Sequence, residues 1–152
     1  VNLIALCSPL NPTGTTFKKE TLLEISQLVI KENKRRAANN IKPLYILYDQ
    51  IYWQLTYGKT VHYNPVELVP EMRDFTIFVD GISKAFAATG VRVGWAFGPV
   101  HVINKMKAML SHIGAWAPKA EQLATASYLQ QTNNVLDYLN HIKQLFKQQS
   151  YE

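Results

Sequence analysis

The sequence predicts an α/β fold with a mainly parallel sheet flanked by helices, and three observations lead to that class. Short apolar runs at 2–7, 44–48 and 75–79 end in polar or turn-forming residues, as buried strands do. A long amphipathic stretch at 18–38 lies between the first two runs. This strand–helix–strand order favours a right-handed crossover between parallel neighbours.

Composition and charge place the chain among ordinary globular domains. With 152 residues, 47% hydrophobic and 18% charged, it is long enough to bury roughly 68–70% of its unfolded surface. The sequence has no apolar window of about 18 residues, and its first residues show neither a basic region nor a small-residue cleavage site, so we expect no membrane span and a cytoplasmic location. The single Cys7 cannot form an internal disulfide and is predicted to be a small buried hydrophobe. The net charge of +5 is spread out, and the basic cluster at 31–36 is predicted to be a solvated helix face.

The first helix is expected over 18–38, because its apolar residues recur at helical spacing. Thr16 is a possible cap at its start, and the Asn pair at 39–40 marks its end. The stretch 50–73 is irregular, which predicts a loop with short helical pieces. The residues that interrupt it are Gly58, Pro65 and Pro70.

The C-terminal half is predicted to be one more strand followed by helices. Residues 93–98 form the strand, and a helix then runs from Pro99 to about His112. Gly114 ends that helix and Pro118 opens a last helical tract, with a bend expected at 132–134.

Lys84 is the strongest candidate for a reactive residue. It follows the run 75–79 and an Asp-Gly pair, so its amine is expected at the carboxyl end of a strand, where open α/β sheets bind ligands. The apolar residues at 86–88 are expected to desolvate it partly, which favours a neutral, nucleophilic amine. Arg92 lies between two glycines and offers a planar fork for a phosphate. The two suggest a phosphorylated carbonyl ligand, although a surface lysine and a solvated arginine in a turn would give the same pattern.

Three polar residues follow three predicted strands. Asn11 comes after the first, Asp49 after the second and Lys84 after the third. Singly, each has an ordinary explanation, namely a turn, a helix cap and a surface lysine. Together they are what a ligand crevice at a sheet edge requires.

These residues resemble motifs of the class I/II aminotransferases, fold-type-I enzymes that depend on pyridoxal phosphate. The segment 8–14 is similar to the family's Asn-Pro-x-Gly turn, and 83–94 is similar to its lysine loop. The segment 48–52 is similar to its Asp-x-x-Tyr sequence, and it is followed by further matching residues, which are Leu55, Tyr57, Gly58 and His62. The resemblance covers most of the chain, with three motifs in order.

The resemblance implies roles for the residues that would act on the cofactor. Lys84 would form the internal aldimine and, once displaced by the substrate, move a proton between Cα and the cofactor as the acid–base catalyst. Asp49 would pair with the pyridine nitrogen and keep it protonated. Asn11 and Tyr52 would hydrogen-bond the phenolic oxygen, which makes Tyr52 part of the catalytic set.

The resemblance also implies that Arg92 binds the cofactor's phosphate, with Ser83 as a weaker helper. The chain departs from the family pattern at two places. Gly81 stands where many members carry a hydroxyl residue, and Gln50 stands where many carry Glu.

By the same resemblance, the strand at 93–98 runs antiparallel and the sheet is mixed. Residues 1–132 would be part of the cofactor-binding large domain, and 133–152 a helical tail leading towards a small domain. We therefore expect a piece of a longer, homodimeric protein that acts on an amino acid and a 2-oxo acid. Alone, the piece is expected to be inactive, because the ring-stacking aromatic and the carboxylate-binding arginine of the family cannot be located in it.

Other functions fit the same residues. One is a pyridoxal-phosphate-dependent lyase, decarboxylase or racemase of the same fold. Another is a non-catalytic ligand-sensing domain in a transcription regulator, which the upstream sequence would reveal through a DNA-binding head. A basic nucleic-acid module ranks last, because only the net charge of +5 supports it.

Overall fold

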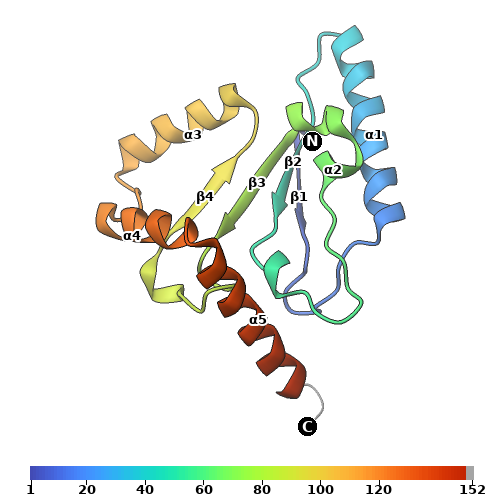
Figure 1. Cartoon of the computed structure of the whole chain (residues 1–152). Coiled ribbons are helices and arrows are strands. Elements are labelled where there is room, and N and C mark those ends of the chain that lie inside the picture. The colour runs from blue at the N-terminus through green and yellow to red at the C-terminus, as the bar shows by residue number, and fades with distance from the viewer. Residues whose placement is uncertain (150–152) are drawn as a thin grey trace.

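The computed structural model describes residues 1–149 and contains a four-stranded sheet flanked by helices (Figure 1). The strands are β1 (Leu3–Cys7), β2 (Tyr45–Asp49), β3 (Thr76–Gly81) and β4 (Gly94–Phe97), and they lie in the order β1-β2-β3-β4. β1, β2 and β3 are parallel, and β4 is antiparallel to β3. The predicted mixed, mainly parallel sheet is confirmed.

The helical elements follow the predicted order. They are α1 (Lys19–Ala38), η1 (Trp53–Leu55), α2 (Pro65–Leu68), η2 (Pro70–Asp74), η3 (Thr89–Val91), α3 (Val100–Ile113), α4 (Lys119–Leu129) and α5 (Thr132–Gln149). The cap predicted at Thr16 is wrong, because α1 starts later, after Lys18, and no side chain caps it. The bend predicted at 132–134 is also misplaced, since the break falls before α5 begins at Thr132. The last three residues of the predicted tail, 150–152, lie outside the described residues.

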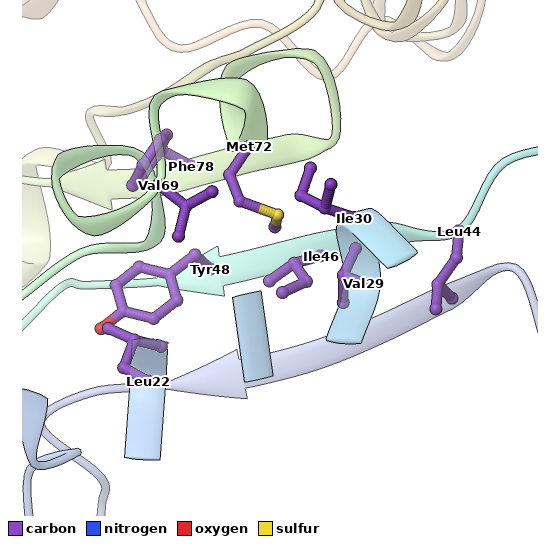
Figure 2. Packing of buried hydrophobic residues seen from close by; sticks show 9 residues of the cluster. All are labelled: Leu22, Val29, Ile30, Leu44, Ile46, Tyr48, Val69, Met72 and Phe78. Carbon is purple, nitrogen blue, oxygen red and sulfur yellow. The ribbon is translucent and has the colours of Figure 1, made fainter. Parts of the chain in front are cut away.

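The core lies between α1 and one face of the sheet. Figure 2 shows Leu22 and Val29 of α1 directed at Ile46 and Tyr48 of β2, and these four side chains are almost completely buried. Side chains alternate across a strand, so the even-numbered residues of β2 enter this core. Asp49 therefore lies on the other face.

That second face of the sheet is more open. Leu3 of β1 is 49% exposed there, and Ala5 is also exposed. The start of α3 meets this face through a 2.9 Å hydrogen bond between the Tyr45 hydroxyl and Nε2 of His101. Within residues 1–149, no helix combines the length and hydropathy needed to cross a membrane.

Two polar side chains attach α1 to the sheet. The buried Asn33 donates to the Leu44 carbonyl at 2.9 Å and accepts from the Leu44 amide at 2.7 Å, just before β2 begins. Arg36 donates to the carbonyl oxygens of Val1 and Lys42, both at 3.0 Å. The prediction of a solvated basic face is therefore wrong at Arg36, because backbone carbonyls outside the helix hold its guanidinium.

Candidate active site

The carboxyl ends of three neighbouring strands meet at one edge of the sheet, the lower edge in Figure 1. Backbone bonds continue the ladder to that edge, from the Ser8 amide to the Asp49 carbonyl (3.0 Å) and from the Gln50 amide to the Val79 carbonyl (3.1 Å). Asn11 and Lys84 follow in the turns after β1 and β3. Because the strands are parallel, the predicted alignment of three strand ends is confirmed.

Asn11 and Tyr52 line one cavity of about 420 Å³. The Asn11 turn is closed by a 2.7 Å bond from the Gly14 amide to the Leu10 carbonyl, with Gly14 at φ 66°. Positive φ is costly for residues with a Cβ, so glycine suits this turn. Polar groups from the turns after β1 and β2 thus line the same cavity.

Asp49 ends β2 beside Cys7 of β1, its register partner. Its Oδ1 accepts the Ile51 amide at 3.1 Å, which orders the turn that leads to Tyr52. Burial raises the pKa of the Cys7 thiol, and the neighbouring Asp49 charge raises it further. Cys7 is only half-buried, so the prediction of a buried hydrophobe is wrong. Its position opposite the packed core explains the exposure.

Lys84 is exposed in the connection between β3 and β4, beside a half-buried Ser83. The next residue, Ala85, is 3% exposed, and the Phe86 ring packs on Tyr138 and Tyr128 with centroids 5.7 and 5.9 Å apart. The apolar neighbours of Lys84 in sequence therefore turn towards other elements and leave its amine in solvent. The predicted partial desolvation of Lys84 is wrong for this reason.

Arg92 has a left-handed backbone conformation with φ 61°, and its Nη1 donates to the Thr89 carbonyl at 2.9 Å. Ala87, in the same connection, is also left-handed, with φ 49°. Such conformations cost of order 1–3 kcal/mol for residues other than glycine and tend to occur at functional sites. The connection that carries Lys84 is strained on both sides of η3.

The glycine at position 81 is required by packing. A Cβ there would lie 2.9 Å from the Val93 carbonyl oxygen and 3.0 Å from the Gly94 Cα. Since both atoms belong to the backbone, only a shift of β4 would make room for a side chain. The absence of a hydroxyl residue at this position follows from the close approach of β3 and β4.

Asp80, which the sequence reasoning did not single out, is a buried carboxylate on β3, 8% exposed. Its Oδ2 accepts Nε1 of Trp53 at 2.8 Å and Nε2 of Gln50 at 3.3 Å, and its Oδ1 accepts the Gly81 amide at 2.7 Å. Burial raises the pKa of Asp80, and the three hydrogen bonds oppose that rise. The available signal was parity, because Asp80 lies on the same face of β3 as the buried Thr76 and Phe78.

A second cavity of about 660 Å³ lies between the segment 50–67 and α5 and includes His62. Burial lowers the pKa of His62, and within residues 1–149 neither of its ring nitrogens has a hydrogen-bond partner. Tyr48 and Trp53 flank its ring, each with a centroid distance of 6.0 Å. His62 is therefore held by aromatic packing.

The predicted site residues thus fall into two groups at one edge. Asn11, Asp49 and Tyr52 belong to the turns after β1 and β2, whereas Ser83, Lys84 and Arg92 belong to the connection after β3. The residues that line the 420 Å³ cavity come from the first group's turns alone. An amine, a carboxylate and a guanidinium at one sheet edge can bind an anionic ligand and exchange protons with it.

The chain is similar to proteins of known type. A family model described as aminotransferase class I and II matches residues 1–151. A probable aspartate/prephenate aminotransferase of Rhizobium leguminosarum bv. phaseoli is 31% identical over 92% of this chain and 32% of its own length. An aspartate aminotransferase of Streptomyces avermitilis is 38% identical over 72% of this chain and 24% of its own length. A solved aspartate aminotransferase of Thermus thermophilus with maleate superposes with a TM-score of 0.84 at 27% identity, over 97% of this chain and 35% of that structure. The chain thus spans between about a quarter and about a third of the length of these relatives.

Proposed function

The chain belongs to the aminotransferase class I and II family, and on this premise we propose that the full-length protein transfers an amino group between an amino acid and a 2-oxo acid, with pyridoxal phosphate as cofactor. The observation that carries the proposal is that Asn11, Asp49 and Lys84 follow three adjacent parallel strands and reach one edge. The two relatives described above carry aspartate in their names, so aspartate is the first amino donor to assay.

The side chains at this edge suit the proposed cofactor. The Arg92 guanidinium matches a phosphate, and Asn11 and Tyr52 offer an amide and a hydroxyl in one cavity. The Asp49 carboxylate, already oriented by the Ile51 amide, can accept a bond from a protonated ring nitrogen. When bound, pyridoxal phosphate withdraws electrons from the substrate's Cα.

Lys84 would have two tasks in this site. Its Nζ would hold the cofactor covalently, and as a free amine it would accept the proton from the substrate's Cα. Because Lys84 is exposed, its side chain is free to extend towards the cofactor and towards the substrate's Cα. Tyr52 and Asn11 would hold the cofactor's ring oxygen while the proton moves.

Covalent labelling tests the assignment of Lys84. The full-length protein is incubated with pyridoxal phosphate, reduced with borohydride and mapped by peptide mass analysis, and the label is expected on Lys84. Lys84→Arg keeps the charge and should abolish labelling while the fold persists. A label on Lys19 or Lys59 instead would refute the assignment.

Cofactor retention tests the assignment of Arg92. Arg92→Lys should weaken binding of pyridoxal phosphate about tenfold or more, because an ammonium cannot reproduce a bidentate bond to phosphate. Arg73→Lys is the matched control, since Arg73 is an exposed arginine of η2 away from the sheet edge. Equal dissociation constants for the two variants in equilibrium dialysis would show that Arg92 does not bind the phosphate.

The division of the chain at residue 132 stays a prediction. The start of α5 at Thr132, directly after the break that follows α4, supports it. So does the lack of buried residues in α5, which is consistent with a helix that leaves the sheet domain. Homodimer formation is likewise a prediction for the full-length protein.

A further inference from the structure

Asp80 joins the turn after β2 to the end of β3 through one carboxylate. Trp53 and Gln50, which donate to its Oδ2, belong to the turn after β2, and Tyr52 lies between them in sequence. The Gly81 amide, which donates to Oδ1, belongs to the last residue of β3, and the connection that carries Lys84 follows directly after it. The turn after β2 is itself compact, with the Trp53 amide bonded to the Gln50 carbonyl at 2.9 Å. A change at Asp80 therefore acts on the turn after β2 and on the end of β3, from which the Lys84 connection starts.

The residue types fit this arrangement. Three donors face Asp80, and a carboxylate is the side chain that only accepts. A carboxamide at position 80 would place its NH₂ group against a donor on one side. At position 50, a glutamate would set a second carboxylate against Asp80, whereas Gln50 supplies an N–H. The departure of position 50 from the family pattern thus has a structural reason in this chain.

We propose that Asp80 is a positioning residue that holds the Tyr52 turn against the end of β3, from which the Lys84 connection starts. Its meaning for catalysis rests on the proposed function, because Tyr52 and Lys84 must then contact the same cofactor. Asp80 lies on the core face of β3, opposite in parity to Asp49, so it acts through these segments rather than on the cofactor. Loss of the Asp80 carboxylate should therefore weaken cofactor binding by displacing Tyr52.

A double-mutant cycle tests the dependence on Tyr52. The dissociation constant of pyridoxal phosphate is measured by equilibrium dialysis for the full-length protein, Asp80→Asn, Tyr52→Phe and the double variant. Asp80→Asn should weaken binding about tenfold, the equivalent of one lost hydrogen bond. In the Tyr52→Phe background it should add less than about twofold, because residues that act as a unit are not additive. Equal weakening in both backgrounds would overturn the proposal.

Hydrogen exchange tests the link between the Tyr52 turn and the end of β3 without any cofactor. Asp80→Asn should speed exchange of the backbone amides at 51–55 by about tenfold, since one lost hydrogen bond removes their anchor. Asn33→Asp is the matched control, because it makes the reverse amide-to-carboxylate exchange at a buried site on α1. It should leave exchange at 51–55 unchanged once global stability is subtracted. Equal exchange in the two variants would refute the positioning role.

Trp53→Phe provides a second variant if Asp80→Asn does not fold. It removes one donor and keeps the carboxylate on β3, and Trp53 is 37% exposed, so the fold should tolerate it. It should change exchange at 51–55 in the same direction and by less. If the unaltered protein does not retain pyridoxal phosphate, the proposed function fails, and the exchange comparison alone decides on Asp80.

Discussion

Helix α1 and the three helices α3, α4 and α5 differ in what their apolar residues contact. α1 buries Leu22, Val29 and Ile30 against the sheet and fixes its orientation with the buried Asn33. No described residue of α3, α4 or α5 is buried, although Leu123 and Leu136 occupy apolar positions at helical spacing. Amphipathic periodicity is present in both regions, but only in α1 does it lead to full burial of apolar side chains; α4 and α5 contact the rest of the chain through partly exposed rings such as Tyr128 and Tyr138.

The sheet and α1 therefore provide most of the fold's stability within the described chain. Apolar burial is the main favourable term in folding, and it is concentrated between α1, β2 and η2. The exposed fractions of 62% at Leu123 and 52% at Leu136 show helices whose apolar sides meet solvent. Such surfaces are typical of contact regions in larger assemblies.

The largest expected effect comes from shortening a buried side chain of α1. Leu22→Ala should cost about 2–5 kcal/mol of unfolding free energy, because it leaves a cavity in a fully buried site. Leu123→Ala should stay within about 0.5 kcal/mol, since its side chain is largely exposed. Urea denaturation of both variants gives the two values. A similar loss for Leu123 would break the contrast between the regions.

A second comparison of a packed and an open site lies in the β3–β4 region, where a side chain is added to a glycine. Gly81→Ser should cost about 1–3 kcal/mol, because its Cβ meets the backbone of β4. Gly90→Ser is the matched control in the same connection, where a Cβ would meet no atom within 4 Å. Thermal unfolding of the pair should show a lowered midpoint for position 81 alone. Equal unfolding midpoints for the two variants would mean that β4 moves aside without cost to make room for the added side chain.

The smallest expected effect is electrostatic and lies on the exposed side of α1. Hydrogen bonds from Arg35 and Arg36 lower the pKa of Glu32 to about 2. Because the folded pKa lies below the ordinary value of 4.5, the stabilisation is complete above that pH and is lost as the pH falls towards 2. Glu32→Gln should therefore lower the urea midpoint slightly at pH 6 and hardly at all near pH 2. Salt should reduce the difference, because the Arg35 side chain of the Glu32–Arg35 pair is largely solvated.

Glu24→Gln controls for the general effect of removing a negative charge from α1. In the structure of residues 1–149, the ion pairs of α1 join Glu32 to Arg35 and Arg36, and Glu24 is exposed. Its substitution should leave the pH dependence unchanged. An equal pH effect at both positions would assign the acid sensitivity to net charge instead of to the Glu32 pairs.

The sequence was sufficient for elements whose pattern is local. The strand runs, the glycine that ends α3 and the broken stretch after β2 were predicted because apolar periodicity and turn residues encode them directly. The alignment of Asn11, Asp49 and Lys84 also followed, since parallel strands bring their carboxyl ends together.

What the sequence did not reveal depends on contacts between distant segments. Lys84 is exposed because Phe86 packs on residues of α4 and α5. Arg36 is held by the carbonyls of Val1, before β1, and of Lys42, before β2. Asp80 accepts a hydrogen bond from Trp53, which lies 27 positions earlier in the sequence. No local pattern specifies such partners, so only the folded arrangement shows them.

The pairing of Cys7 with Asp49 has a consequence for redox chemistry. A thiol with a raised pKa is mostly protonated at neutral pH, and thiols react with peroxides and alkylating reagents as thiolates. Cys7 should therefore be slow to oxidise although it is only half-buried. Because it is the chain's only cysteine, its rate of alkylation reports on a single place. That rate should rise when the Asp49 charge is neutralised, which makes Cys7 a built-in sensor of the charge at the end of β2.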